Sequence, residues 1–464
     1  MPNPHYIHAI QINTEKCIGC SHCMRVCSTH AIRIVDGHAR IMPERCVDCG
    51  ECYNVCPVAA VYVKSDSLET HLQQYVYKIA LVPSVFFGQF PTKYSVSQIS
   101  AAIRQLGFNE VFEVEHAVDF VKEEYKMKAE EPDVLKPVIS SFCPSVVRLI
   151  QVMFPSLTEN VFLLKAPHDL AAIYLRDINS NTNIHPEDIG IFYISPCASK
   201  IVAAKAPEGE DKSPTDVVVN MKEFYNKVYK TIIDSKKIDE LKRSSTMTSD
   251  SVKWSLSGTE REYFKGRSLA IDGVDNVIKF LEKLESGHIT DIDFLELRVC
   301  DQGCAGGILC PGNRFLTVER IGERQKTLQE RLLENEVVNN PLMKYKEQLH
   351  RVSKTQAIYP REGLLLDADL EIALRKMQKI KTLKSYLPGF DCGACGAPTC
   401  KNLAEDIVKG EASMSHCVFV QRVMEKNYKL SPEQAFQMIE KIWGKNRLNK
   451  YTDNHGEKES EKTD

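Results

Sequence analysis

The sequence is short of the features that mark membrane, secreted and nucleic-acid-binding proteins. It has no run of 18 apolar residues, so no segment is expected to cross a membrane. Residues 1–6 contain no basic stretch followed by an apolar one, so no signal peptide is expected and the predicted location is cytoplasmic. The formal net charge of −3 lacks the positive excess that is typical of nucleic-acid binding, so no nucleic-acid partner is expected.

Disulfides are not expected either, because the cytoplasm is reducing, yet the chain has 17 Cys beside only 2 Trp. Hydrophobic residues make up 43% of the 464 residues, which is enough for globular domains, and the length predicts about three of them. The cysteines fall into groups of eight, five and four, which span 17–56, 143–310 and 392–417. This clustering indicates metal or redox chemistry in three regions.

The eight N-terminal cysteines form two runs of identical spacing. The pattern Cys-x2-Cys-x2-Cys-x3-Cys is typical of bacterial two-cluster ferredoxins, in which three neighbouring thiolates bind one [4Fe–4S] cluster and the fourth binds the other. The predicted ligands are Cys17, Cys20, Cys23 and Cys56 for one cluster, and Cys46, Cys49, Cys52 and Cys27 for the other. Zinc sites usually have two close pairs with a longer spacer, so three thiolates within seven residues favour iron–sulfur clusters.

The four C-terminal cysteines have another spacing. They are Cys392, Cys395, Cys400 and Cys417. Gly393 and Gly396 allow the backbone to wrap closely around a cofactor, and a helix predicted over 401–410 returns the chain toward the last cysteine. Residues 387–425 resemble the small four-cysteine iron–sulfur domain of corrinoid proteins and electron-transfer subunits, which implies a further [4Fe–4S] cluster. A closed zinc site is the alternative, because four thiolates also suit zinc.

Between these regions the sequence alternates between strands and helices, which predicts an α/β domain. Strands are predicted at 78–83, 111–114, 138–140 and 189–194, and helices at 96–105 and 274–284. Cys143 and Cys197 each follow a predicted strand, and Cys300 and Cys304 lie in a Gly-rich segment. Taken alone, these four residues could be ordinary buried thiols.

The segments 140–144, 195–200 and 296–307, in this order, resemble the three signature loops of the [FeFe]-hydrogenase catalytic domain. Shorter matches lie at 106–108, 167–169 and 273–276, and the resemblance extends over roughly residues 77–350. It implies two α/β lobes and a [4Fe–4S] subcluster held by Cys143, Cys197, Cys300 and Cys304. It also implies that Cys304 bridges to a diiron centre with CO and cyanide ligands, and that Lys200 contacts a cyanide.

Three neighbours of this site depart from the family pattern, whereas Glu296 matches a family glutamate. Phe142 replaces a cysteine that relays protons, Ala203 replaces a relay glutamate, and Arg298 replaces a methionine. Relay groups contribute about 10²–10⁴-fold each in acid–base catalysis, so proton delivery should be slow. The pattern resembles the sensory branch of the family. Typical members of that branch add a PAS domain that this sequence does not contain, so we expect a partner to read the signal.

The expected organisation is a ferredoxin-like α+β domain, a hydrogenase-like α/β domain and a small helical iron–sulfur domain. Their boundaries are 1–70, 77–360 and 387–425, with a linker helix at 361–386 and a helical and disordered tail at 426–464. The highly charged residues 318–356 are interpreted as a solvated helical extension. Cys310 is left without a ligand role and is interpreted either as a plain thiol or as a proton or redox group near the active centre.

Two functions follow from these patterns. The first is a sensory-type [FeFe]-hydrogenase that oxidises H₂ or reduces protons slowly, or senses H₂ or redox state, with Cys304 and Lys200 as the catalytic residues. The alternative is an electron-transfer subunit with four [4Fe–4S] clusters and no diiron centre. Expected partners are a ferredoxin, an oxidoreductase subunit, or a signalling kinase or phosphatase. A third hypothesis, an iron–sulfur assembly factor, is disfavoured by the paired ferredoxin runs.

Overall fold

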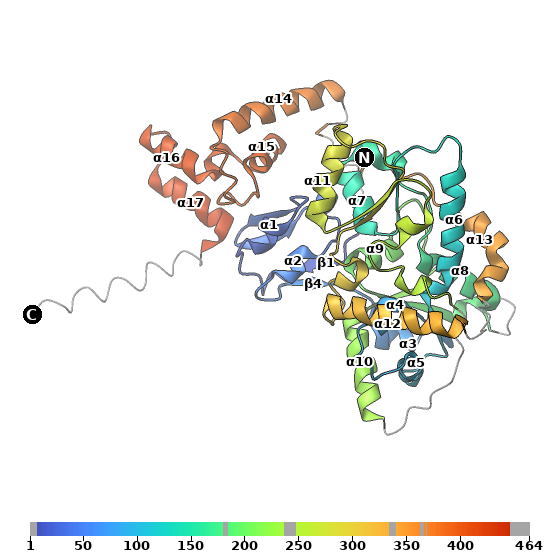
Figure 1. Cartoon of the computed structure of the whole chain (residues 1–464). Helices are drawn as coiled ribbons and strands as arrows, with labels where there is room; N and C mark the ends of the chain where they lie inside the picture. Colours follow the sequence, from blue (N-terminus) through green and yellow to red (C-terminus); the bar gives the residue numbers. More distant parts are fainter. Residues whose placement is uncertain are drawn as a thin grey trace, which may run out of the picture.

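The computed structural model describes residues 7–179, 184–235, 247–333, 340–361, 366–367 and 369–445. Three units follow one another along the chain: an N-terminal unit of short strands and helices, a large α/β unit, and a C-terminal helical unit (Figure 1). The disordered tail expected after residue 445 lies outside the described residues. Among the described helices, none combines the length and the apolar character of a membrane-spanning segment.

The N-terminal unit contains two antiparallel strand pairs. The pairs are β1 (Ile10–Ile12) with β4 (Val61–Val63), and β2 (Ile32–Val35) with β3 (His38–Ile41). The short helices α1 (His22–Val26) and α2 (Glu51–Asn54) each carry the third cysteine of one run, and α3 (Leu68–Leu72) leads into the next unit. One small apolar cluster, with Met24 and Ile32 among its members, fills the space beside α1. Little core is therefore available to this unit without a metal cluster.

Two parallel sheets form the large unit, which confirms the predicted α/β class with two lobes. The strand order is β6-β5-β8-β9 in the first sheet and β10-β11-β7 in the second. The strands are β5 (Tyr77–Val82), β6 (Glu110–Glu113), β7 (Val138–Ile139), β8 (Ile189–Ser195), β9 (Val217–Asn220), β10 (Ser268–Asp272) and β11 (Phe294–Arg298). β8 is buried along its whole length between two neighbouring strands, which explains its unbroken apolar sequence.

Helices pack around both sheets. They are α4 (Ser84–Phe87), α5 (Val96–Gln105), α6 (Val118–Glu130), α7 (Pro144–Met153), α8 (Pro167–Asn179), α9 (Ala198–Lys205), α10 (Met221–Asp234), α11 (Val274–Glu285), α12 (Arg314–Leu333) and α13 (Lys346–Val352). The predicted helix α5 begins with a reciprocal capping box between Ser95 and Gln98. The charged segment 318–356 is largely helical as predicted, but it is not wholly solvated. Ile321 and Leu328 of α12 are buried in the main core, because α12 packs on α4.

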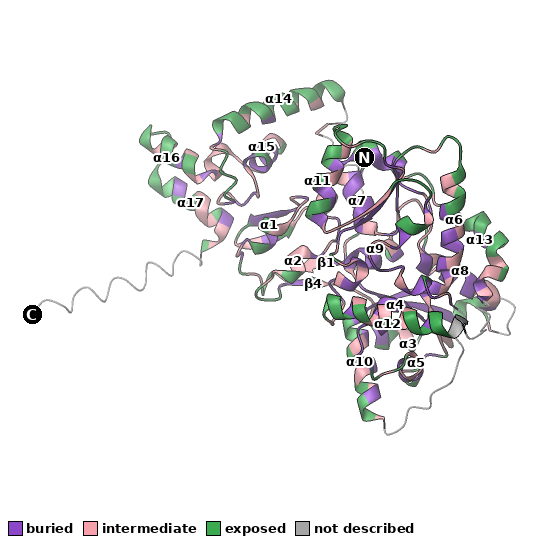
Figure 2. Ribbon diagram, in the orientation of Figure 1, coloured by how far each residue is buried: buried purple, intermediate pink, exposed green. Residues whose placement is uncertain are grey.

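The described part of the C-terminal unit contains four α-helices. They are α14 (Leu370–Tyr386), α15 (Cys400–Lys409), α16 (Val418–Lys426) and α17 (Pro432–Trp443). α14 lies along α15 and exposes its other side (Figure 2). α17, within the predicted tail, returns to the N-terminal unit, where the N–H groups of Asp36 and Gly37 donate to carbonyls of α17 at 2.9 and 3.0 Å. This part of the tail is therefore a packed element.

Candidate iron–sulfur sites

The first set of thiols gathers around α1. Burial raises the pKa of Cys23 to about 12, and the other thiols of its predicted set contribute to the increase. These thiols are Cys17, Cys20 and Cys56. Four thiols that oppose one another's ionisation suit a metal cluster, because its positive charge relieves the repulsion between thiolates.

The second set gathers in the same way around α2. Burial raises the pKa of Cys49 to about 12, with the largest thiol contribution from Cys27 of the other run. Burial also raises the pKa of Cys46 and Cys52, and Cys27 and Cys49 contribute to both increases. The fourth thiol of each run therefore lies with the opposite run, and each set has the donors of one [4Fe–4S] cluster.

Backbone amides point at three of these sulfurs. Ala31 N–H donates to Cys27 Sγ at 3.2 Å, and Ala60 N–H donates to Cys56 Sγ at 3.2 Å. Ala39 N–H donates to Cys17 Sγ at 3.4 Å. Bonds of this kind to a ligand sulfur are outer contacts that orient the ligands of a metal site.

The middle set forms where strands of the two sheets end. Cys143 follows β7 and Cys300 follows β11 in the second sheet, whereas Cys197 follows β8 in the first. Burial raises the pKa of Cys300 well above its usual value, and the three other thiols of its predicted set contribute. The carboxyl ends of parallel strands are the usual place for ligand sites in α/β folds. Here both sheets supply donors to one site.

Cys304 of this set faces cations as well as thiols. Burial raises the pKa of Cys304 to about 11, although the charges of Lys200 and Arg298 act to lower it. Cys310 lies beside it, and its Sγ donates to the Cys304 carbonyl oxygen at 3.3 Å. Burial raises the pKa of Cys310 well above its usual value, so this thiol stays protonated. Through its hydrogen bond to the Cys304 carbonyl oxygen, Cys310 contacts the backbone of the site.

The C-terminal set surrounds the start of α15. Burial raises the pKa of Cys395 to about 11, and Cys417 and Cys392 contribute to the increase. Cys400 and Cys417 are buried in the same apolar cluster, whereas Cys392 is the exposed cysteine of the chain.

The two glycines of this loop serve a packing role that the sequence did not predict. A Cβ atom on Gly393 would lie 2.9 Å from Cε of Met24, and one on Gly396 would lie 2.4 Å from the carbonyl oxygen of Ile34. Both glycines have positive φ, 75° and 80°, which other residues rarely adopt. They therefore bring the C-terminal cysteine loop into direct contact with the N-terminal unit.

The four thiol sets follow one another through the molecule. The C-terminal loop contacts Met24, the neighbour in sequence of Cys23. Cys23 contributes to the raised pKa of Cys52, which links the first and second sets. Cys49 contributes to the raised pKa of Cys300, which links the second and middle sets. The N-terminal unit lies between the other two units (Figure 1).

Buried ion pairs fix this arrangement. Asp48 lies between two cysteines of the second run and pairs with Arg148 of α7 at 3.3 Å. It also accepts hydrogen bonds from the N–H groups of Ala9 and Ile10 at 3.1 and 3.2 Å. On the other side, Arg33 of β2 forms two hydrogen bonds to one carboxylate of α15, at 2.6 and 3.0 Å. That carboxylate belongs to Asp406, and both pairs are almost fully buried.

A small cavity lies beside Cys304, where the sequence resemblance implies a diiron centre. Cys304, Lys200 and Phe142 line it. Three further lining residues have a buried polar atom without a hydrogen-bond partner in the described part of the chain: His168 (Nε2), Trp254 (Nε1) and Ser255 (Oγ). The free volume is about 20 Å³, which holds about one water-sized molecule.

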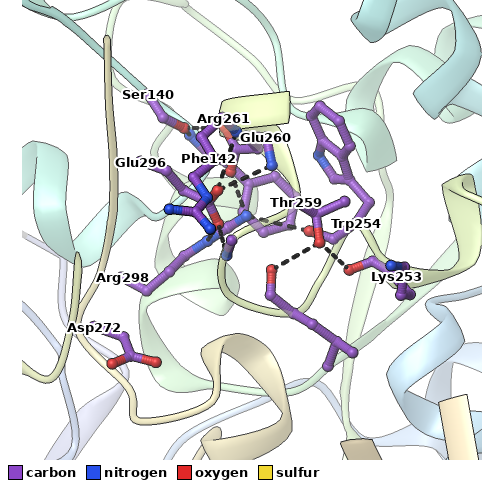
Figure 3. A network of polar contacts seen from close by, with 12 residues as sticks. Ser140, Phe142, Lys253, Trp254, Thr259, Glu260, Arg261, Asp272, Glu296 and Arg298 are labelled. Carbon is purple, nitrogen blue, oxygen red and sulfur yellow. Dashed lines mark hydrogen bonds and ion pairs between the residues drawn. The ribbon is translucent and has the colours of Figure 1, made fainter. Parts of the chain in front are cut away.

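Phe142 contacts both cations of the site. Its ring centre is 3.8 Å from Lys200 Nζ and 3.9 Å from Arg298 Cζ, so both cations contact the ring. Figure 3 shows the ring beside Arg298. Lys200 Nζ also donates to the carbonyl oxygen of Phe142 at 3.2 Å. Among the described residues, no carboxylate lies within ion-pair distance of Lys200.

Two buried glutamates hold Arg298 in place (Figure 3). Arg298 forms ion pairs with Glu260 and with Glu296, the second at 3.4 Å. Glu296 also accepts hydrogen bonds from the N–H groups of Gly258 at 2.9 Å, Glu260 at 2.9 Å and Arg261 at 3.3 Å. The hydroxyls of Tyr125 and Ser140 donate to Glu260. No motif marks Glu260 or Tyr125, so sequence analysis missed them.

The donor sets fit iron–sulfur clusters, but the cavity does not fit a diiron centre. In the two N-terminal sets and the middle set, thiols of the predicted ligand set act on one another's pKa, as do Cys392, Cys395 and Cys417 of the C-terminal set, and thiols are the donors that a [4Fe–4S] cluster requires. The cavity offers a thiol and an ammonium group, but Phe142 forms part of its wall and the remaining space holds about one water-sized molecule, which is less than two irons with several diatomic ligands need. Ala203, on α9, is partly buried and supplies no proton-relay group.

Three family models match the chain. The model for the iron only hydrogenase large subunit, C-terminal domain, matches residues 73–266. A 4Fe–4S dicluster domain model matches residues 9–57, and a model for a putative Fe–S cluster matches residues 387–419. Iron–sulfur segments therefore flank a hydrogenase-type domain.

Curated relatives match over part of their length. Iron hydrogenase 1 of Clostridium pasteurianum is 24% identical over 258 residues, which cover 45% of this chain and 44% of that protein. The periplasmic [Fe] hydrogenase large subunit of Nitratidesulfovibrio vulgaris is 25% identical over 266 residues, which cover 53% of this chain and 63% of that protein. The chain thus spans less than two thirds of either relative.

A solved [FeFe]-hydrogenase, a variant of HydA1 from Chlamydomonas reinhardtii, has a TM-score of 0.49 at 16% identity and covers 63% of this chain and 99% of that one. Together, the hydrogenase domain model, the two flanking iron–sulfur models and the curated relatives show that the chain combines a domain similar to that of [FeFe]-hydrogenases with iron–sulfur domains.

Proposed function

We propose that this protein passes single electrons along four [4Fe–4S] clusters that lie in one line. The order of the thiol sets carries the proposal, because each set has the next one as its neighbour. The line runs from the C-terminal unit, through both sets of the N-terminal unit, to the middle set. The proposed domains are those expected from the sequence, with the helical part of the tail packed on the N-terminal unit.

The proposed ligands follow the four sets. They are Cys392, Cys395, Cys400 and Cys417; Cys17, Cys20, Cys23 and Cys56; Cys46, Cys49, Cys52 and Cys27; and Cys143, Cys197, Cys300 and Cys304. Iron–sulfur clusters supply one-electron chemistry, and burial and hydrogen bonds to sulfur tune their potentials. The protein's part is to hold neighbouring clusters close together and to exclude water from the buried thiols.

The two ends of the line differ in access. At one end the exposed Cys392 brings its cluster to the surface, where a redox partner protein such as a ferredoxin or an oxidoreductase subunit exchanges electrons. At the other end Cys300 and Cys304 are buried in the large unit. The middle cluster therefore stores or senses an electron that arrives through the chain.

Hydrogen turnover or H₂ sensing is the second candidate function. The observation that favours it is the shared cavity of Cys304 and Lys200, the two residues that the family resemblance assigns to the diiron centre. The small volume of this cavity and the contact of Lys200 with Phe142 favour the electron-relay function instead.

Iron counting on anaerobically reconstituted protein tests the proposal. Four clusters predict about 16 irons and about 16 sulfides per chain. The matched variant Cys310→Ser should keep this count, because Cys310 belongs to no set, whereas Cys49→Ser should lose the second cluster. A reproducible content of three clusters or fewer in the wild type would overturn the proposal.

A further inference from the structure

We infer that Phe142 closes the pocket beside Cys304 and so excludes a diiron unit from this hydrogenase-type domain. The inference rests on the proposed function only in treating the middle set as the ligands of a [4Fe–4S] cluster. Phe142, which stands where the family pattern has a cysteine, fills space that a bound diiron unit would need.

The position of Phe142 supports this role. It precedes Cys143 in the chain, is 9% exposed, and shares the wall of the cavity with Cys304. The space beside the ring holds about one water-sized molecule. The polar atoms of His168, Trp254 and Ser255 that make no hydrogen bond to the described residues suit such a molecule, which needs about two to four polar partners.

The ring is also held in place. A cation near an aromatic ring is attracted most strongly where water is excluded, and Lys200 and Arg298 are 3% and 2% exposed. Their distances to the ring centre, 3.8 and 3.9 Å, place both in direct contact with it. Moving the ring aside would leave two buried cations without this partner.

Arg298 cannot easily move away with the ring. Its guanidinium group is bound by Glu260 and Glu296, and it donates to the carbonyl oxygen of Trp254 at 3.2 Å. Removing one member of a buried ion pair is strongly destabilising. The glutamates therefore keep Arg298, and through it the Phe142 ring, in the closed position.

Lys200 is diverted by the same contact. The family resemblance assigns this lysine to a cyanide ligand, but here its ammonium group lies on the Phe142 ring and donates to the Phe142 carbonyl oxygen. The phenylalanine at position 142 thus fills the pocket and also binds the ammonium group of Lys200.

Binding of a synthetic diiron complex tests the inference. Cluster-loaded wild type, Phe142→Leu, Phe142→Ala and Phe142→Cys are incubated anaerobically with a diiron dithiolate complex that carries CO and cyanide. Each is then desalted and examined by infrared spectroscopy and iron counting. We expect no retained CO or cyanide bands in the wild type or in Phe142→Leu, which keeps most of the bulk.

The smaller side chains should open the pocket. Phe142→Ala and Phe142→Cys should retain the bands, and their iron content should rise from about 16 to about 18 per chain. Retained bands in the wild type would overturn the inference. It would also be overturned if Phe142→Cys, with all four clusters loaded, retained none. If Phe142→Ala fails to fold, the result for Phe142→Cys alone tests the inference. A missing cluster in the wild type counts against the proposed relay instead, so the two failures are distinguishable.

Discussion

The N-terminal unit and the middle site hold their thiols in different ways. The N-terminal unit takes eight cysteines from 40 consecutive residues, and its apolar core is small. The middle site takes four cysteines from the ends of strands in two sheets, and a large apolar core surrounds it. The fold of the N-terminal unit depends on its clusters, whereas apolar packing holds the fold around the middle site without its cluster.

Iron removal should separate the two regions most clearly. With an iron chelator under reducing conditions, residues 7–64 should lose most of their protection from amide hydrogen exchange, because metal binding supplies much of the folding free energy there. The strands of the large unit should keep theirs, since β5, β8 and β11 are supported by buried apolar side chains. Hydrogen exchange with mass spectrometry measures both. Equal loss in the two regions would contradict the comparison.

The Asp48→Ala substitution should break the connection between the two regions. It removes a buried partner of Arg148, which is 2% exposed, and loss of one member of a buried pair costs about 3–5 kcal/mol. Chemical denaturation should show this loss, with earlier unfolding of the N-terminal unit. Asp301→Ala is the matched control, because its pair with Arg314 is half exposed and should contribute little. Similar losses in both variants would show that burial does not govern this contact.

The pH dependence of stability should report on the cavity beside Cys304, because Glu115 also lines it. Burial, with Glu113 nearby, raises the pKa of Glu115 to about 8. The pKa of a glutamate in the unfolded chain is about 4.3. The protonated carboxyl of Glu115 therefore contributes its full stability below about pH 4.3, and this contribution is lost as the pH rises through about 8. Glu115→Gln should therefore become more stable relative to the wild type across this window, by at most about 1.4 kcal/mol per pH unit.

Denaturation of both proteins at about pH 5 and about pH 8 measures this difference. The substitution Glu411→Gln, at an exposed position, is the control for replacing a glutamate by a glutamine. A difference between Glu115→Gln and the wild type that stays constant over this pH range would show that the pocket does not protect the protonated carboxyl.

The smallest effect is expected on the outer face of the C-terminal unit. Arg375 pairs with Glu371 at 2.6 Å, but the two side chains are 68% and 76% exposed. Exposed pairs contribute about 0.2–1 kcal/mol, so Arg375→Ala should lower the free energy of unfolding by less than about 1 kcal/mol. A loss as large as that of Asp48→Ala would indicate that α14 has a buried partner.

The sequence predicted the local features of this molecule well. The grouping of the N-terminal thiols stays a prediction that rests on the spacing of the two runs. Buried strands such as β8 were visible as unbroken apolar segments, and the start of α5 was marked by its capping residues.

The features that were missed depend on distant residues. Arg298 was recognised as a departure, but its partner Glu260, and Tyr125, whose hydroxyl donates to Glu260, lie more than 35 residues away and in no motif. The packing of Gly393 on Met24 joins positions at opposite ends of the chain. The buried side of α12 was missed because its sequence is dominated by charged residues.

The electron relay is tested most directly by the magnetic interaction between neighbouring clusters. Reconstituted protein is reduced stepwise under anaerobic conditions and followed by electron paramagnetic resonance. The linear order predicts that the fully reduced protein shows spin–spin interaction between neighbours, and that Cys49→Ser removes the interaction of the middle cluster while the C-terminal and first clusters still interact. Four independent signals without interaction in the wild type would contradict the line of clusters.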